Sequence, residues 1–216
     1  MSGLSLSLGH GSTQASAIID GYWLSSATQY YDERVSGQFS AKIVQAQLAQ
    51  DQIFLDNCYE SMHVLSTIKN HMQLDTQKDT RFQLPDGESI VVPGHCLYKA
   101  SLIYTEPAIL GFSNKPLAQS LDELVQQIPV ANLREMKTLH ISGGMGNCKQ
   151  LTDFLARKWF QESIQITSSQ ANPQWDAYIG AQAVLMCAPD AAFISKKDFA
   201  EKGSGVWSTK RPETQL

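Results

Sequence analysis

One glycine-containing stretch, residues 136–147, constrains the fold of this chain more than any other segment. A short apolar run with β-branched residues ends there in Ser142-Gly143-Gly144. A helical pattern follows, and its apolar stripe consists of Leu151, Phe154, Leu155 and Trp159. A strand, a glycine turn and a helix in this order can bring backbone N–H groups close to a phosphate. The stretch therefore predicts a strand–turn–helix unit and a candidate phosphate cradle.

The neighbouring segments alternate between strand and helix patterns. Strands are expected at residues 4–8, at 15–24 with a turn at Asp20-Gly21 that starts a third strand, at 28–32 and at 163–167. Helices are expected at residues 38–49, from an N-cap at Asp51 onward, at 116–128, at 175–187 and at 195–201. This order predicts an α/β domain.

Three further segments carry local information. A Pro-Asp-Gly turn at residues 85–87 predicts a hairpin within residues 82–94. Residues 98–111 are apolar and contain Pro107, so we expect a packed irregular segment there. Gly180 lies near the start of the helix expected at residues 175–187, where glycine is about 1 kcal/mol less favourable than alanine. Its presence predicts that some other group approaches the backbone closely.

Charge and cysteine spacing exclude several classes of function. The net charge of −4 provides no basic footprint for direct binding to nucleic acid. No apolar run approaches the roughly 20 residues of a membrane span, and no signal peptide is indicated at the start. The cysteines form no C-x-x-C pair, which favours buried thiols in a reducing compartment. His95-Cys96 has no second ligand pair nearby in the sequence, so no metal site is expected.

Several motifs together resemble the C-terminal half of actin and actin-related proteins, and the match covers nearly the whole chain. Residues 82–87 (Phe-Gln-Leu-Pro-Asp-Gly) resemble the family's aromatic-x-Leu-Pro-Asp-Gly hairpin, and residues 141–144 (Ile-Ser-Gly-Gly) resemble its Leu-Ser-Gly-Gly turn. Residues 178–181 (Tyr-Ile-Gly-Ala) are similar to Trp-Ile-Gly-Gly, and residues 193–199 to Trp-Ile-Ser-Lys-x-Glu-Tyr. Gly9-His10-Gly11, followed by Gly21-Tyr22, resembles the second phosphate loop, Asp-Ser-Gly-Asp-Gly.

The resemblance implies one lobe of the actin-like ATPase fold, which is ribonuclease H-like, with a mixed β-sheet packed with helices. In the intact family, two such lobes close on ATP and a divalent ion, and each lobe contributes one phosphate loop. We expect a single actin-like C-terminal lobe over residues 1–216, with a core from about 3 to 202 and a polar tail at 203–216. The chain is thus expected to be a truncated member without the first lobe and its phosphate loop.

The residual nucleotide-binding positions implied by the resemblance are Gly9, Gly11, Gly143, Gly144 and Met145. They supply backbone groups and one apolar side chain, and no charged group. The alternative interpretation of these glycines is that they only shape turns and allow strands and helices to pack.

The chain departs from the family where the chemistry is performed. Ser7 and His10 stand at the positions of two aspartates, and neither provides the anionic oxygen that Mg²⁺ prefers. Gln14 replaces a histidine near the attacking water, and Cys58-Tyr59 replace a Lys-Glu pair that holds adenosine. Gly37 keeps a glycine near the nucleoside. Because hydrolysis needs positioned phosphates, a metal and an oriented water, we expect no ATPase activity, no catalytic residue, no metal and no cofactor. Residual binding of ATP or ADP is the alternative.

The sequence therefore predicts a non-catalytic, actin-related structural subunit, a pseudo-ATPase held in a larger protein complex. Half of a two-lobed fold would expose apolar surface, so other protein subunits should cover the face of the missing lobe. The chain is not expected to be a free monomer or to contact membranes. A cytoplasmic, cytoskeletal or motor-associated complex is favoured, and a nuclear chromatin-remodelling complex is an alternative. Two other hypotheses are a nucleotide-binding half completed by a separate chain and a truncated product without an independent role.

Overall fold

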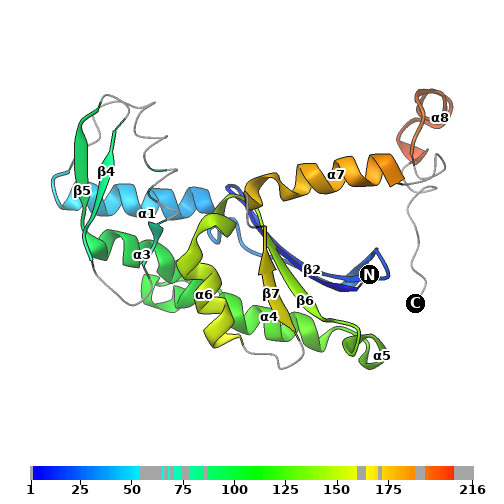
Figure 1. The fold of residues 1–216 in the computed structure, drawn as a ribbon, viewed down its shortest axis with the longest axis horizontal. Helices are drawn as coiled ribbons and strands as arrows, with labels where there is room; N and C mark the ends of the chain where they lie inside the picture. Colours follow the sequence, from blue (N-terminus) through cyan, green and yellow to red (C-terminus); the bar gives the residue numbers. More distant parts are fainter. Residues whose placement is uncertain are drawn as a thin grey trace.

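A five-stranded mixed β-sheet organises the protein, with the strand order β3-β2-β1-β6-β7 (Figure 1). The computed structural model describes residues 2–53, 65, 68, 71–73, 78–84, 87–159, 164–169, 172–187 and 193–206. Strands β1 (Gly3–Leu8), β2 (Thr13–Ile19) and β3 (Tyr22–Tyr30) form an antiparallel meander. Strands β6 (Thr138–Ser142) and β7 (Gln165–Ser168) extend the sheet in parallel with β1. The mixed sheet packed with helices confirms the expected α/β class.

Alternating side chains explain why β1 lies in the middle of the sheet. Leu4, Leu6 and Leu8 are buried on one face, and the serines between them are half-buried on the other. Strand β6 repeats this pattern with Leu139 and Ile141. Both strands therefore direct apolar side chains into the same core.

The predicted turn at Asp20-Gly21 is confirmed, whereas the prediction of a separate strand at residues 28–32 is wrong. Asp20 and Gly21 both have positive φ, 51° and 84°, as a tight hairpin turn between twisted strands requires. Strand β3 continues from this turn to Tyr30. Its pairing jumps from Leu24 to Thr28 opposite adjacent β2 residues. This bulge interrupts the period-2 pattern, so one strand looked like two.

Four helices gather beside one side of the sheet in Figure 1. They are α1 (Gly37–Gln50), α3 (Gly94–Thr105), α4 (Leu117–Gln126) and α6 (Lys149–Lys158). Between them lie the short α5 (Val130–Leu133) and two 3₁₀ turns, η2 (Pro107–Leu110) and η3 (Gly144–Asn147). The predicted stripes of α4 and α6 are buried at Leu117, Leu121, Leu124, Leu151, Leu155 and Trp159, and half-buried at Phe154.

Helix α3 corrects the expectation of an irregular segment at residues 98–111. It is a regular helix in which nine of the twelve residues are buried. Its half-buried residues, His95, Tyr98 and Lys99, form only a narrow stripe, so the helix lacks the broad polar face by which amphipathic helices are recognised. Pro107 opens η2, which begins after the helix has ended at Thr105.

Asp51 does not begin the next helix as expected; it is the C-cap of α1. Most of the helix predicted after it, including Cys58-Tyr59, lies outside the described residues. Strands β4 (Thr80–Gln83) and β5 (Ser89–Val92) form the predicted hairpin, and Gly87 has the positive φ of 92° expected in its turn. The other two turn residues, 85 and 86, also lie outside the described part of the chain.

An arm leaves the sheet on the side away from α3, α4 and α6 (Figure 1). It consists of η4 (Pro173–Trp175), α7 (Asp176–Cys187) and α8 (Lys196–Lys202). A capping box between Ser195 and Asp198 starts α8 where the sequence predicts a helix. The first residues of the expected polar tail form the turn η6 (Gly203–Gly205), and Val206 after it is buried. None of the helices among the described residues combines the length and apolar content that a membrane crossing requires.

Candidate functional site

The predicted phosphate-loop residues come together at one edge of the sheet. Strands β1 and β6 are parallel neighbours, and Ser7 pairs with Ser142 near their carboxyl ends. The turn that follows β1 and the turn that follows β6 therefore lie side by side. This places Gly9 and Gly11 beside residues 143–145, as the resemblance implies.

Two of these glycines are required by the local packing. A Cβ atom on Gly9 would lie 2.6 Å from the carbonyl oxygen of Ser12, which accepts the Gly9 N–H. Gly143 has a φ of 90°, and a Cβ there would lie 2.5 Å from the carbonyl oxygen of Leu8. Both glycines thus allow the two turns to close against neighbouring backbone.

The other two glycines are not required in this way. A Cβ atom on Gly11 or Gly144 would meet nothing within 4 Å. The turn-shaping interpretation therefore accounts for Gly9 and Gly143, and nothing in the local packing accounts for Gly11 and Gly144.

The remaining positions are packed against one another. Met145 is buried, and its Sδ lies 3.1 Å from where a Cβ on Gly37 would stand. The N–H of Gly37 donates to the carbonyl oxygen of Gly9 at 3.1 Å. This hydrogen bond holds the start of α1 against the turn that follows β1. The Gly143 N–H donates to the Pro173 carbonyl oxygen at 2.9 Å.

These residues do not fit a metal-bound nucleotide in this arrangement. The Gly143 N–H is used within the chain, and Met145 and Gly37 are in contact where a nucleoside is implied. Ser7 and His10 carry no carboxylate for a divalent ion. Gln14, at the position of the water-orienting residue, donates from Nε2 to Ser16 Oγ at 3.3 Å.

A small pocket of about 180 Å³ adjoins the turn that follows β1 and the start of α1. Gly11, Ser36, Gln38, Phe39 and three charged residues line it, the charged ones being Glu33, Arg34 and Lys42. The lining thus combines one acid with two bases. It is a polar surface hollow beside the turn rather than an apolar nucleoside slot.

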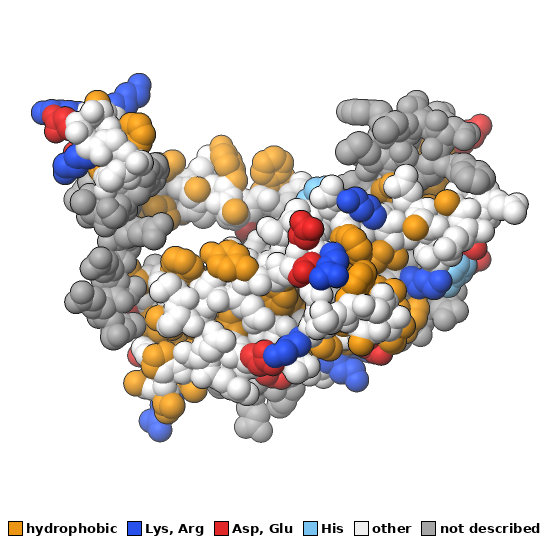
Figure 2. All heavy atoms as spheres, turned by 180° about the vertical axis from the view of Figure 1, so that it is seen from behind, with side chains coloured by type: hydrophobic (Ala, Val, Ile, Leu, Met, Phe, Trp, Pro, Cys, Tyr) orange, Lys and Arg blue, Asp and Glu red, His pale blue; other side chains and the backbone are white. Residues whose placement is uncertain are grey.

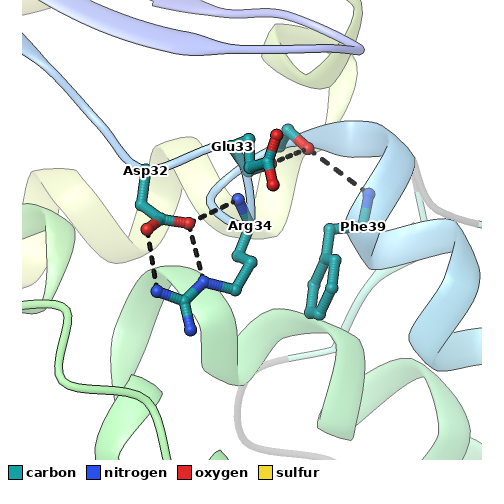
Figure 3. A network of polar contacts seen from close by, with 5 residues as sticks. Asp32, Glu33, Arg34 and Phe39 are labelled. Carbon is teal, nitrogen blue, oxygen red and sulfur yellow. Dashed lines mark hydrogen bonds and ion pairs between the residues drawn. The ribbon is translucent and has the colours of Figure 1, made fainter.

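Arg34 is oriented by Asp32, as Figure 3 shows. Arg34 Nε and Nη2 each donate to the Asp32 carboxylate at 2.7 Å, and the backbone N–H of Arg34 adds a third bond at 2.9 Å. These hydrogen bonds lower the pKa of Asp32 to about 2. The guanidinium also lies 5.1 Å from the centre of the Phe112 ring, which in turn packs edge-on against Phe39. The network fixes the connection between β3 and α1.

Helix α7 presents a feature that the sequence analysis did not identify. Every residue from 177 to 187 is exposed, although most are apolar. The large members of this exposed set are Tyr178, Ile179, Val184, Leu185 and Met186, and the last two are 65% and 86% exposed. The helix packs mainly on the preceding turn η4. A helix that is apolar around its whole circumference is normally buried, so this one is a candidate interface.

The base of α7 is attached firmly to the sheet. Asp176 in its first turn lies 3.0 Å from Nε2 of His140 on β6. Thr167 Oγ1 on β7 lies 3.5 Å from the other ring nitrogen of His140. Figure 2 shows hydrophobic side chains along the arm, with charged side chains gathered at its far end. Helix α7 therefore contacts the sheet through its first turn and is exposed to solvent from residue 177 to residue 187.

Gly180 does not meet the close neighbour that the sequence predicts. A Cβ atom there would contact nothing within 4 Å among the described residues. The glycine instead lies in the exposed part of α7. The expected close approach has no partner within the described part of this chain.

Comparison with known proteins gives an informative similarity. The chain is 23% identical over 224 residues to actin-like protein 9 of Rattus norvegicus. The alignment covers 95% of this chain and 54% of the relative, so the chain spans about half the length of the curated relative it matches. No family model matches the chain. The similarity supports an actin-related relationship.

Proposed function

We propose that this chain is a non-catalytic, actin-related structural subunit that is held in a larger protein assembly through helix α7. The observation that carries the proposal is the full exposure of an apolar helix whose base is fixed to the sheet. Apolar area contributes roughly 25 cal/mol per Å² when it is removed from water. Burial of Leu185 and Met186 against another subunit would therefore by itself favour association of this chain with that subunit.

The chemistry of α7 favours a protein as the occupant. Membrane-surface helices carry a strongly charged, usually basic face opposite the apolar one. The polar side chains of α7 are Asp176 and Gln182, and no basic residue occurs in it. A hydrophobic protein groove is therefore the surface that fits a helix without a charged face.

The proposal includes the absence of ATP hydrolysis by this chain. Its reasons are the replacement of the metal-side acids by Ser7 and His10 and the packing of Gly37 on Met145. We propose that the glycine turns serve as packing junctions and that no cofactor binds there. Residual binding of ATP or ADP is the competing proposal, and the open Gly11 and Gly144 favour it.

For the setting of this assembly, we propose a cytoskeletal or motor-associated complex in the cytoplasm. The actin-related relationship supports it, and a nuclear chromatin-remodelling complex is the alternative. In either setting, other protein subunits cover the apolar arm, and neither nucleic acid nor membrane is a direct partner.

A photo-crosslinking amino acid at Val184 tests the interface in the native assembly. Val130 on α5 is the matched control, because it is also an exposed valine on a helix, at 81% compared with 57%. We expect a protein adduct in high yield from position 184 and little from position 130. Equal yields at both positions, or no adduct at 184, would contradict the interface.

The nucleotide question has a separate readout. The native assembly is purified through this chain, denatured, and the released nucleotide is quantified by chromatography and mass spectrometry. The proposal expects no nucleotide that depends on this chain. Release of one ATP or ADP per chain, lost in a Gly144→Val variant and retained in Val130→Ala, would favour the competing proposal.

A further inference from the structure

Three side chains with metal-binding atoms meet where α1 ends and α3 begins. Asp51 is the C-cap of α1, and His95 and Cys96 lie in the first turn of α3. Nε2 of His95 lies 2.9 Å from Oδ2 of Asp51. Sγ of Cys96 lies 3.4 Å from the same carboxylate oxygen and 3.6 Å from Nε2 of His95. One imidazole nitrogen, one sulfur and one carboxylate oxygen therefore form a compact triangle.

We infer that Asp51, His95 and Cys96 bind a divalent transition-metal ion, and that zinc fits them best. Zinc lies about 2.3 Å from a cysteine sulfur and about 2.0 Å from histidine nitrogen or carboxylate oxygen, so tetrahedral angles place these atoms roughly 3.3–3.6 Å apart. The two edges that include sulfur already have these lengths. The nitrogen–oxygen edge, at 2.9 Å, has to lengthen by about 0.4 Å.

The donor types select the class of metal. Thiolate and imidazole favour zinc and similar ions, whereas Mg²⁺ and Ca²⁺ require sets composed of oxygen. Cys96 is buried, while the His95 and Asp51 side chains remain 42% and 32% exposed. The fourth donor of a tetrahedral ion is then a water molecule or a further ligand.

The same residue types could instead suggest a nucleophilic thiol, but the geometry argues against it. A Cys–His–Asp relay uses the two ring nitrogens of histidine separately, one for the thiol and one for the carboxylate. Here a single nitrogen, Nε2, lies close to both groups. Burial, and then the hydrogen bond to Asp51, raise the pKa of the Cys96 thiol to about 12, so it stays protonated without a metal. A coordinated thiol is deprotonated by the ion itself.

Contacts that do not involve the three ligands hold their backbones in place. Asp79 Oδ1 accepts the N–H of Gly94 at 3.0 Å and so fixes the first turn of α3. Lys99 Nζ donates to Gln47 Oε1 at 2.5 Å, which joins α3 to the last turn of α1. The site is thus formed before an ion arrives, and a bound ion would tie the two helices together.

Titration of the purified 216-residue chain with Co²⁺ tests the inference, because cobalt replaces zinc and reports its ligands by absorption. After removal of metals with a chelator, we expect one Co²⁺ per chain, a thiolate-to-cobalt charge-transfer band and strong visible bands typical of tetrahedral coordination. Zn²⁺ should displace the cobalt and remove the bands. Absence of the charge-transfer band at a stoichiometric cobalt concentration would overturn the inference.

Variants identify the ligands. Cys96→Ser should abolish the charge-transfer band, and His95→Gln or Asp51→Asn should each weaken cobalt binding by at least about tenfold. Cys187→Ser, at an exposed cysteine of α7, is the matched control and should retain the band. A band that survives Cys96→Ser, or disappears with the control, would contradict the site.

Folding of each variant is checked by circular dichroism. If Cys96→Ser disturbs the buried start of α3, the site is tested with variants of the two half-exposed ligands, His95 and Asp51, alone. Unchanged cobalt affinity in both His95→Gln and Asp51→Asn would then overturn the site. None of the three ligands lies on α7, so the result is independent of the proposed protein interface.

Discussion

At the scale of single residues, the Asp32–Arg34 pair makes a clear prediction about pH. Hydrogen bonds from Arg34 lower the pKa of Asp32 from 3.8 to about 2, so the carboxylate is favoured in the folded state. Its stabilising contribution is present above the ordinary pKa and is lost as the pH falls through about 2. Because the pair is exposed, its effect on the free energy of unfolding should be small.

NMR titration of the Asp32 carboxyl carbon measures this shift directly. Arg34→Gln should return the pKa toward its ordinary value. Lys42→Gln is the matched control, since it removes a positive charge from the same pocket without removing a hydrogen bond to Asp32. A pKa that is ordinary in the wild-type chain, or that responds equally to both substitutions, would disprove the contact.

The residue scale also shows what sequence alone could not provide. Gly143 and Gly144 are adjacent and were predicted to have one role, but their φ angles and neighbours separate them. Asp51 lies far along the chain from His95-Cys96, and only the packing of α1 on α3 brings the three together. Spacing in the sequence predicts local sites, and a site assembled across elements needs the fold.

At the scale of elements, the junction between β6 and η3 should depend on one glycine of its pair. Gly143→Ala should lower the free energy of unfolding by about 2 kcal/mol or more, because its φ is positive and the new Cβ meets the Leu8 carbonyl oxygen. Gly144→Ala should change it by less than about 0.5 kcal/mol, because the new Cβ meets nothing. Urea denaturation measures both, and equal effects would refute the assignment.

Helices α3 and α7 explain where the sequence prediction of elements succeeded and failed. Neither has a broad polar face, so neither shows the amphipathic period of α4 or α6. The limits of α7 were predicted closely, at 175–187, whereas α3 was missed. The pattern of apolar residues in the sequence could not show that α3 is buried and α7 is exposed, because burial depends on neighbours from other parts of the chain.

At the scale of the whole molecule, the chain purified alone should associate with itself through α7. Leu185→Glu should shift sedimentation velocity profiles toward the monomer, because a charge on the bare helix opposes apolar contact. Ile109→Glu in η2 is the control, since Ile109 is 60% exposed and Leu185 65%. A wild-type chain that is monomeric would contradict self-association through α7. An equal shift toward the monomer by both substitutions would contradict it as well.

The α/β class and the turn at Asp20-Gly21, in contrast, followed from the sequence, and the resemblance implied the mixed sheet. The strand order β3-β2-β1-β6-β7 and the parallel pairing of β1 with β6 were not predicted, because they join segments far apart in the chain. The packing of Met145 on Gly37 beside the two glycine turns could not be expected either, because a resemblance transfers positions and not contacts.

The pairing of β1 with β6 has a consequence for how the protein acquires its structure. Leu4 pairs with Leu139, so the central contact of the sheet joins positions separated by more than half of the chain. On a ribosome, the β1–β3 meander emerges before β6, and one edge of β1 waits unpaired until β6 has been synthesised. Long-range parallel pairing of this kind closes slowly and leaves a strand edge open to wrong partners. During synthesis, β1 is therefore exposed to mispairing until β6 has emerged.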